Sequence, residues 1–349
     1  MEEGAPTPAS QPRLIGHAEA EAAMLAAMQD RLHHAWLITG VKGIGKATLA
    51  YRFARKLLAE AHDGPAGGPG LFGDAPAAPA SLHVAPEHPV FQRVAHGGHA
   101  DLTVIERTED PKTGKMRGEI PVDDIRRLIR FFSLTGAETG RRIAIIDAVD
   151  DLNRNAANAL LKVLEEPPKD ALLLLIAHRP GRLLPTIISR CRRLALAPLK
   201  DAEVETWLRE AHPDVDDADR HAVVAMAEGS IGRASILCGA DGIAVLEAFT
   251  RLADNLVKAS AADIHGFADK VFDRGSDEKY RIFQDLLRGW ITRRTSQAAA
   301  AGAPRQLEQW MELWEKVSHL SERADAVHLD RKQVIISVLL GAQAVVRQA

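Results

Sequence analysis

The stretch WLITGVKGIGKATLAYRF, residues 36–53, comes within one residue of the phosphate-binding pattern G-x-x-x-x-G-K-[ST]. Gly40, Gly45 and Lys46 satisfy the pattern, but Ala47 stands where the pattern requires a hydroxyl. An apolar segment of strand length, AWLITG, precedes the glycines, and an amphipathic segment of helix length, KATLAYRFARKLLAEA, follows them. Because phosphate binding needs this order of strand, glycine loop and helix, the stretch predicts nucleotide binding or descent from it.

The missing hydroxyl affects metal binding more than phosphate binding. Backbone N–H groups of a glycine loop hold phosphate oxygens, and Lys46 would reach the terminal phosphates. The hydroxyl absent at Ala47 is the group that normally ligates magnesium. Thr48 follows one residue later, so its side chain is turned by about 100° around the helix. The candidate nucleotide-binding residues of this loop are Gly40, Gly43, Ile44, Gly45, Lys46, Ala47 and Thr48.

A second apolar strand, predicted at residues 143–146, ends in Asp147. An acidic residue at the end of such a strand is the usual partner of a phosphate loop, because it helps to hold the metal ion. Active ATPases of the AAA+ type usually carry a glutamate directly after this aspartate, to polarise the attacking water, whereas this chain has Ala148. Two catalytic groups, a hydroxyl and a carboxylate, are therefore absent from one site, which favours a site that does not turn over.

Apolar segments of strand length alternate with amphipathic segments of helix length up to about Pro198, which predicts an α/β domain with a parallel sheet. Beyond Leu199 only helical patterns remain. Residues 62–81 are rich in Gly, Pro and Ala and predict a flexible surface insertion. The expected domains are residues 1–198, 199–241 and 242–349.

Finer predictions concern the first domain. The segment DLTVIERTEDPKTGKMRGEIPV, residues 101–122, predicts two short strands around a polar turn. The next segment, VDDIRRLIRFFSL, predicts an amphipathic helix. Asn153 is a candidate N-cap for the helical segment that follows it. The apolar face of the amphipathic helix is expected to comprise Ile125, Leu128, Ile129 and Phe132.

The bulk composition narrows the function classes. With 349 residues the chain has room for two or three domains, and its net charge of -3 argues against a strongly basic nucleic-acid-binding protein. Two cysteines, far apart in sequence, neither form a metal site alone nor suggest a disulfide framework, which fits a reducing cytosol. The N-terminal MEEGAPTPAS has no apolar run, so we expect no secretory signal and a cytoplasmic location.

Five segments together resemble the delta-prime family of clamp-loader subunits of bacterial DNA polymerase III. They are HHAWLITGVKGIGKATLA, IPVDDIRRL, IDAVDDLNRNAANALLKVLEEPP, HRPGRLLPTIISRC and GSIGRA. The match runs from about Arg13 to Ala234 and is most specific between Ile143 and Cys191. The C-terminal third matches in helical character and in the segment LDRKQVIISVL.

The resemblance implies a RecA-like AAA+ domain, a helical lid and a helical collar that packs into a five-membered ring. In this family the ring uses ATP to open the sliding clamp and close it on primed DNA. The delta-prime member closes the ring, does not turn over ATP, and lends an arginine to the ATP site of the neighbouring motor subunit. Carried onto this chain, that arginine finger is Arg190, within the motif Ser189-Arg190-Cys191. Arg233 falls at the position of the lid's nucleotide-sensing arginine, and His178 at a sensor position where active subunits favour Thr or Asn.

The resemblance also implies cofactors and partners. Since the glycines and Lys46 survive, the hypothesis is that the chain binds ATP or ADP without cleaving it. Many relatives hold zinc with four cysteines after the first loop and helix, but this chain has none there, so no zinc is predicted. The implied partners are the motor (gamma/tau) and delta subunits and, through the complex, the sliding clamp and primer-template DNA. The histidines near that segment, expected to be solvated or hydrogen-bonded, are His62, His83, His88, His96 and His99.

Three alternatives stay open at this point. An ATP-hydrolysing motor subunit of the same loader would explain the loop, but Ala47, Ala148 and the missing cysteines speak against it. An independent AAA+ ATPase would need a catalytic glutamate and an aromatic pore loop, and the sequence offers neither. A pure interaction protein with a relict nucleotide fold would differ only in whether Arg190 matters to a partner. No polymerase site is recognisable, and intrinsic ATPase activity is expected to be absent or very weak.

Overall fold

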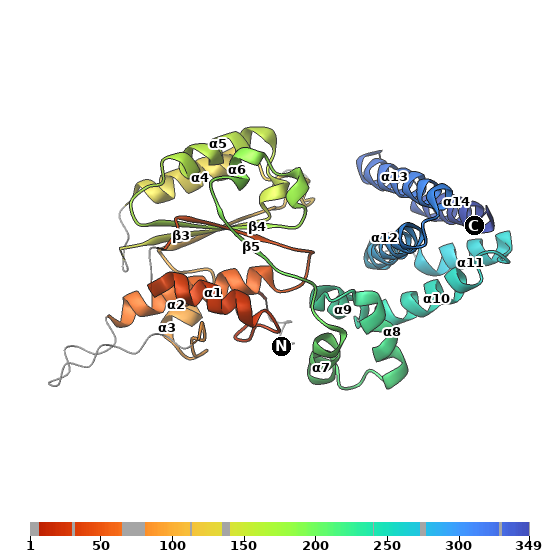
Figure 1. Ribbon diagram of the computed structural model, residues 1–349, viewed down its shortest axis with the longest axis horizontal. Coiled ribbons are helices and arrows are strands. Elements are labelled where there is room, and N and C mark those ends of the chain that lie inside the picture. The colour runs from red at the N-terminus through yellow and green to blue at the C-terminus, as the bar shows by residue number, and fades with distance from the viewer. Residues whose placement is uncertain are drawn as a thin grey trace. The chain divides into compact units, whose positions relative to one another are not determined.

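The computed structural model describes residues 7–29, 32–64, 81–111, 114–134, 140–239, 241–272, 277–327 and 330–348. The chain divides into two compact units, Met1–Glu203 and Val204–Ala349. The first unit combines a sheet with helices, and the second is helical (Figure 1). None of the described helices combines the length and the apolar character that crossing a membrane would require.

The sheet of the first unit has five parallel strands in the order β2-β3-β4-β1-β5. Its central strand, β4, is buried along its whole length, as its sequence ALLLLIA requires. This sheet confirms the predicted α/β fold, and among the described residues no strand follows β5. The strands are β1 (Ala35–Thr39), β2 (Leu102–Glu106), β3 (Arg142–Asp147), β4 (Ala171–Ala177) and β5 (Arg192–Ala195).

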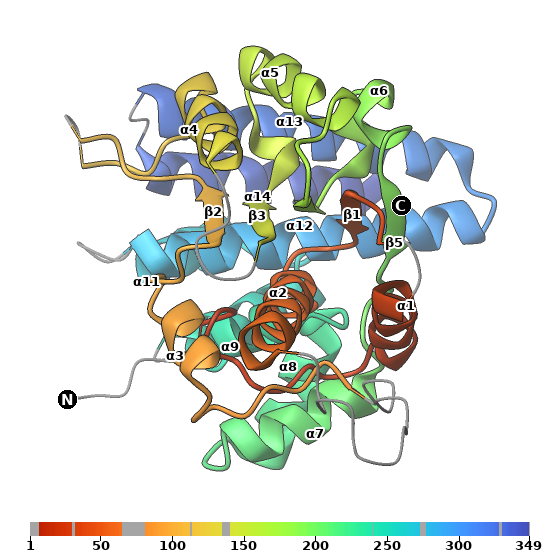
Figure 2. The ribbon, with the colours of Figure 1, turned by 90° about the vertical axis from the view of Figure 1, so that its left-hand side faces the viewer.

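Helices cover both faces of the sheet because side chains alternate between the faces along each strand. Trp36 and Ile38 of β1 pack into one hydrophobic cluster, and Leu37 packs into the other. Figure 2 shows α1 (Ala18–Gln29), α2 (Lys46–Asp63) and α3 (Pro89–Ala95) on one side of the sheet. The other side carries α4 (Val122–Ser133), α5 (Arg154–Glu165) and α6 (Pro185–Ile188), with short 3₁₀ helices η1 (Val149–Asp151) and η2 (Pro180–Arg182) nearby in the chain.

Two of the finer predictions need correction. Of the two strands expected within residues 101–122, the described residues form only the first, and the polar, charged remainder contributes isolated bridges, such as Glu109 to Met116. Ile129 is 37% exposed, because it lies at the edge of the apolar stripe of α4, whereas Asp124 is buried.

The N-cap at Asn153 is confirmed, since its side chain accepts a hydrogen bond from the Ala156 N–H (2.9 Å). Helix α2 extends to Asp63, and most of the predicted insertion at 62–81 lies outside the described residues.

The second unit is built from helices packed around an aromatic cluster. Phe249, Phe267, Phe283 and Trp290 form ring contacts with centroids 5.5–6.4 Å apart, a spacing typical of stabilising aromatic pairs. The boundary predicted at 241 between a lid and a collar stays a prediction. The helices are α7 (Asp201–Ala211, which begins in the first unit), α8 (Asp217–Ala227), α9 (Ile231–Leu237), α10 (Gly242–Asp254), α11 (Ala261–Val271), α12 (Asp277–Ala300), α13 (Pro304–Val327) and α14 (Arg331–Gln348).

Candidate functional site

The loop between β1 and α2 depends on glycine at three positions. Gly40, Gly43 and Gly45 have φ angles of 145°, 82° and 103°, a region that favours glycine. A Cβ at Gly40 would lie only 2.6 Å from the carbonyl oxygen of Leu196. Ile44 is fully buried, and its carbonyl oxygen lies 2.8 Å from Nε2 of His17. The glycines therefore fix a tight turn that brings the chain directly into α2.

The first turn of α2 offers backbone N–H groups at the loop. Gly45 is the N-cap and provides no side-chain hydrogen bond to them. The first N–H groups of a helix have no partner within the helix, so this end is suited to an anion. Ala47 and Thr48 both lie in this turn, and their side chains diverge by about 100°.

The Lys46 side chain packs against the backbone of the loop. It is buried, and the ammonium donates hydrogen bonds to the carbonyl oxygens of Gly40 (2.7 Å) and Val41 (2.5 Å). Burial lowers the pKa of Lys46 to about 8, an effect that the nearby Asp147 and Asp150 partly oppose. Entry of a phosphate would require Lys46 to exchange these carbonyl oxygens for phosphate oxygens.

This lowered pKa predicts a pH dependence of stability. Between about pH 8 and the ordinary value of 10.5, the unfolded chain keeps the Lys46 proton and the folded chain releases it. The unfolded state then binds more protons, so the free energy of unfolding contributed by Lys46 rises with pH across this window. Urea unfolding of wild type and Lys46→Met at pH 7.5 to 10 checks this. As the pH rises, the stability difference between the two proteins should change in favour of the wild type. A difference that stays constant would contradict the lowered pKa of the buried Lys46.

Asp147 ends β3 beside a second carboxylate that sequence reasoning missed. The register of β2 and β3 places Glu106 opposite Asp147. Burial raises the pKa of Asp147, Lys46 opposes this rise, and Glu106 adds to it. Tyr51 of α2 lies at the same corner, where burial raises its pKa to about 12, with smaller contributions from Glu106 and Asp147. These three residues help to line a cavity of about 600 Å³.

Asp150 ties the end of β4 to η1. Its carboxylate is fully buried and accepts hydrogen bonds from the backbone N–H groups of His178 (2.9 Å) and Arg179 (3.2 Å). Asp150 therefore fixes the backbone at the predicted sensor position.

His178 lies beside Asp147 as a neutral ring. Burial, followed by the charge of Lys46, lowers the pKa of His178 to about 4. Its Nε2 lies 3.7 Å from Oδ1 of Asp147, which is too long for a hydrogen bond. The structure thus brings the loop, Asp147 and the predicted sensor residue together at one edge of the sheet.

Arg190 is held by its own neighbourhood. Its guanidinium forms an ion pair with Glu165 (2.8 Å) and donates to the carbonyl oxygen of Thr186 (3.0 Å), and the side chain remains 35% exposed. The Ser189 hydroxyl donates to the same carbonyl oxygen (3.2 Å). Burial raises the pKa of the Cys191 thiol to about 12, so this cysteine is not a nucleophile at neutral pH.

The strand register separates Arg190 from the loop of its own chain. Parallel pairing of β1 with β5 joins Trp36 to Arg192 and Thr39 to Ala195. Arg190 precedes β5 and therefore lies where the parallel strands begin, at their amino-terminal ends. The loop follows β1 and lies at the opposite, carboxyl-terminal ends of the strands. The four residues of β5 alone span about 13 Å. The structure does not bring Arg190 together with Lys46.

Arg233 is engaged inside the second unit. Its guanidinium donates to Glu228 (2.8 Å) and to the carbonyl oxygen of Asp285 (2.8 Å). A Cβ at Gly289 would collide with this guanidinium, so the glycine makes room for it. These contacts show that Arg233 packs α9 against α12, and its predicted sensing role stays a prediction.

One three-residue group among the described residues has the spacing of metal ligands: His62, Asp63 and His88. The irregular spacing in sequence gave no hint that His62 and His88 meet. Nδ1 of His88 accepts from the Val90 N–H (3.1 Å), so in the neutral ring the proton sits on Nε2, which faces Asp63 (3.2 Å). A protonated ring nitrogen cannot ligate a metal, and the geometry favours a hydrogen-bonded cluster. The expectation of no zinc stays a prediction.

Comparison with known proteins relates this chain to replication proteins. A family model described as DNA polymerase III, delta subunit, matches residues 80–200. The chain is 38% identical over 198 residues to DNA polymerase III subunit delta' of Pseudomonas aeruginosa, and 35% identical over 182 residues to that of Bacillus subtilis. These alignments cover 56% and 52% of this chain. In this region the chain is similar to delta-prime subunits of DNA polymerase III.

The similarity has limits in extent and in kind. The chain spans about half the length of the curated relatives it matches, 53% and 47% of the two delta-prime proteins. Gamma and tau subunits of DNA polymerase III also match, at 27–29% identity. Among solved structures, a gamma-subunit-related protein from Thermotoga maritima is similar at 17% identity with a TM-score of 0.48, covering 93% of this chain and 98% of that chain. Structural likeness at this level carries no further argument.

Proposed function

We propose that this chain is a clamp-loader subunit that does not hydrolyse ATP and that lends Arg190 to the ATP site of a neighbouring subunit. The placement of Arg190 carries this proposal, because it lies at the sheet edge opposite its own loop. An arginine that cannot reach its own loop, but is partly exposed, could contact nucleotide phosphates only at the site of a second protein. The ion pair with Glu165 would position the Arg190 guanidinium until phosphates of the neighbour's nucleotide displace Glu165 from it.

The chemistry of the loop supports the second half of the proposal. A bound nucleotide would meet the N–H groups of α2 and the Lys46 ammonium. The loop supplies no magnesium-binding hydroxyl at Ala47, and Ala148 supplies no carboxylate for the attacking water. Bound ATP or ADP would then stabilise the first unit without being cleaved. In this proposal the nucleotide has a structural role.

The proposed partners follow from the proposed family role. They are the motor (gamma/tau) subunits and the delta subunit, with the sliding clamp and primer-template DNA contacted through the assembled ring. Loading a clamp onto bacterial chromosomal DNA would place the chain in the cytoplasm. The gamma and tau matches make a motor subunit the second candidate, and Glu106 beside Asp147 is the carboxylate that could support hydrolysis in that case.

A nucleotide experiment on the isolated chain separates these candidates. ATP and ADP are titrated into the protein by calorimetry with and without magnesium, and phosphate release is followed in the same samples. We expect binding that Lys46→Ala abolishes, little dependence on magnesium because Ala47 offers no ligand, and no phosphate release above background. Glu106→Gln serves as a control and should leave binding intact. Absence of binding at millimolar nucleotide would sink the binding proposal, and magnesium-dependent turnover lost in Glu106→Gln would establish the motor subunit.

A further inference from the structure

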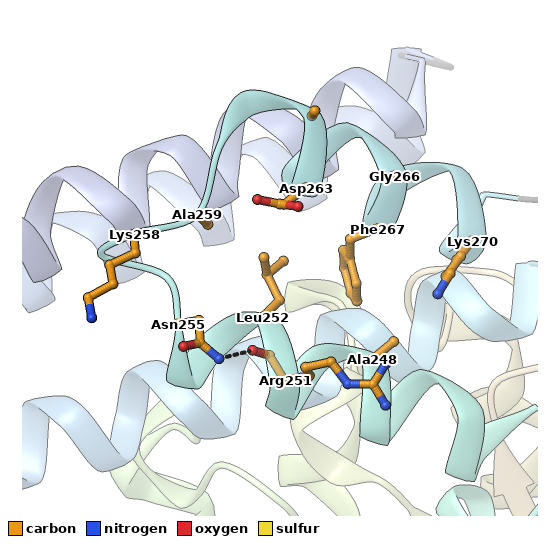
Figure 3. Close-up of a pocket in the computed structure, with 11 residues that line it drawn as sticks. Ala248, Arg251, Leu252, Asn255, Lys258, Ala259, Asp263, Gly266, Phe267 and Lys270 are labelled. Carbon is orange, nitrogen blue, oxygen red and sulfur yellow. Dashed lines mark hydrogen bonds between the residues drawn. The ribbon is translucent and has the colours of Figure 1, made fainter.

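A groove of about 470 Å³ runs between α10 and α11 of the second unit (Figure 3). Leu252 and Phe267 face each other from the two helices and form its floor, with 8% and 5% of their surfaces exposed. Gly266 lies on the wall formed by α11, where an added Cβ would meet nothing within 4 Å. The groove is therefore apolar at its base and open along one wall.

The dimensions of the groove fit a short helix. The lining residues recur at helical spacing, at positions 248, 251, 252 and 255 of α10 and its end, and at 262, 263, 266, 267 and 270 of α11. At 1.5 Å per residue these two rows are about 10 and 12 Å long. That length accommodates about two turns of a docked helix, with apolar side chains one turn apart above Leu252 and Phe267.

The rim of the groove is positively charged. Arg251, Lys258 and Lys270 are exposed on it, and no ion pair links any of them to a described acidic residue. Figure 3 shows Lys258 and Lys270 at opposite ends of the groove. The acidic side chain of the lining, Asp263, is engaged by the N–H (2.8 Å) and the hydroxyl (2.7 Å) of Ser260. Acidic groups on an occupant would therefore find cations along the rim.

We propose that this groove docks an acidic amphipathic helix of a partner protein. Its apolar anchor would cover Leu252 and Phe267, and its flanking carboxylates would meet Arg251 and Lys270. Nucleic acid suits the site less well, because phosphates need the cations but not the apolar floor, and Phe267 is too buried to stack on a base. The proposal does not depend on the role of the ATP site or of Arg190.

The test measures binding of a defined peptide to the full chain. The probe is a fluorescein-labelled helical peptide of about 12 residues with leucine anchors at i and i+4 and glutamates on both flanks. Fluorescence anisotropy should show saturable binding, and a peptide with lysines in place of the glutamates should bind about tenfold more weakly or worse. No binding of the glutamate peptide at about 1 mM would overturn the proposal.

Variants locate the binding. Gly266→Leu fills the groove at a position with free space and raises helix propensity, so the chain should fold while peptide binding falls at least about tenfold. His265→Leu places the same side chain on an exposed neighbouring position outside the groove and should bind like wild type. Circular dichroism checks the fold of both variants. Equal binding by Gly266→Leu and wild type would overturn the site, and displacement of the peptide by a single-stranded oligonucleotide would assign the groove to nucleic acid instead.

Discussion

Arg190→Ala is expected to slow ATP hydrolysis at the neighbouring motor site by about 10³–10⁵-fold, the range that arginine fingers supply. The guanidinium would stabilise charge on the transferring phosphoryl group, and alanine leaves that charge without its donor. Single-turnover hydrolysis in a ring reconstituted with the motor and delta subunits measures the effect. Hydrolysis should be lost at the motor-subunit ATP site that Arg190 contacts.

Three variants make this result specific. Arg193→Ala removes another exposed arginine three residues away on β5 and should leave turnover unchanged. Glu165→Ala frees Arg190 from its ion pair and should keep the neighbour active, because the finger itself is intact. Arg190→Lys retains charge but not the planar fork, and it should recover little of the rate. Turnover within twofold of wild type in Arg190→Ala would exclude the proposed role.

Asp150→Ala is expected to lower the free energy of unfolding by about 3 kcal/mol, the largest stability effect that we predict. The substitution leaves the backbone N–H groups of His178 and Arg179 without their fully buried charged acceptor. Urea unfolding of the isolated chain measures the loss. Asp151→Ala is the matched control: its partly exposed carboxylate pairs with Arg107 (3.0 Å) and Arg179 (3.5 Å), and its loss should cost about 1 kcal/mol or less. Equal losses in the two variants would mean that Asp150 is not the tie between η1 and β4.

The elements that the sequence predicted well are those with a strong local pattern. The apolar runs of β1, β3 and β4 are long enough to indicate buried parallel strands, and the loop between β1 and α2 uses its glycines at positive φ angles. The second strand expected within residues 101–122 failed because its polar residues find no neighbouring strand to complete a ladder. Ile129 was misplaced because an apolar residue at the edge of a helical stripe can face either side.

The residues that sequence analysis missed are those whose positions depend on long-range pairing. Glu106 meets Asp147 only because β2 pairs with β3 in one register, and local pattern does not encode that register. The available signal in the sequence was that two successive predicted strands end in acidic residues, the first in Glu106 and the second in Asp147. The ion pair of Arg190 with Glu165 and the meeting of His62 with His88 likewise join segments whose packing a single sequence does not reveal. Arg190 itself was found through family resemblance, and the register of β5 then added its separation from the loop.

The most direct test of the account compares Lys46→Ala with Arg190→Ala in the same reconstituted ring. DNA- and clamp-stimulated ATP hydrolysis is measured with motor subunits disabled at every site except the one beside this chain. The account predicts that Lys46→Ala leaves turnover nearly unchanged and that Arg190→Ala abolishes it. The opposite pattern, with turnover lost in Lys46→Ala and kept in Arg190→Ala, would show that this loop is itself the working ATPase and would contradict the account.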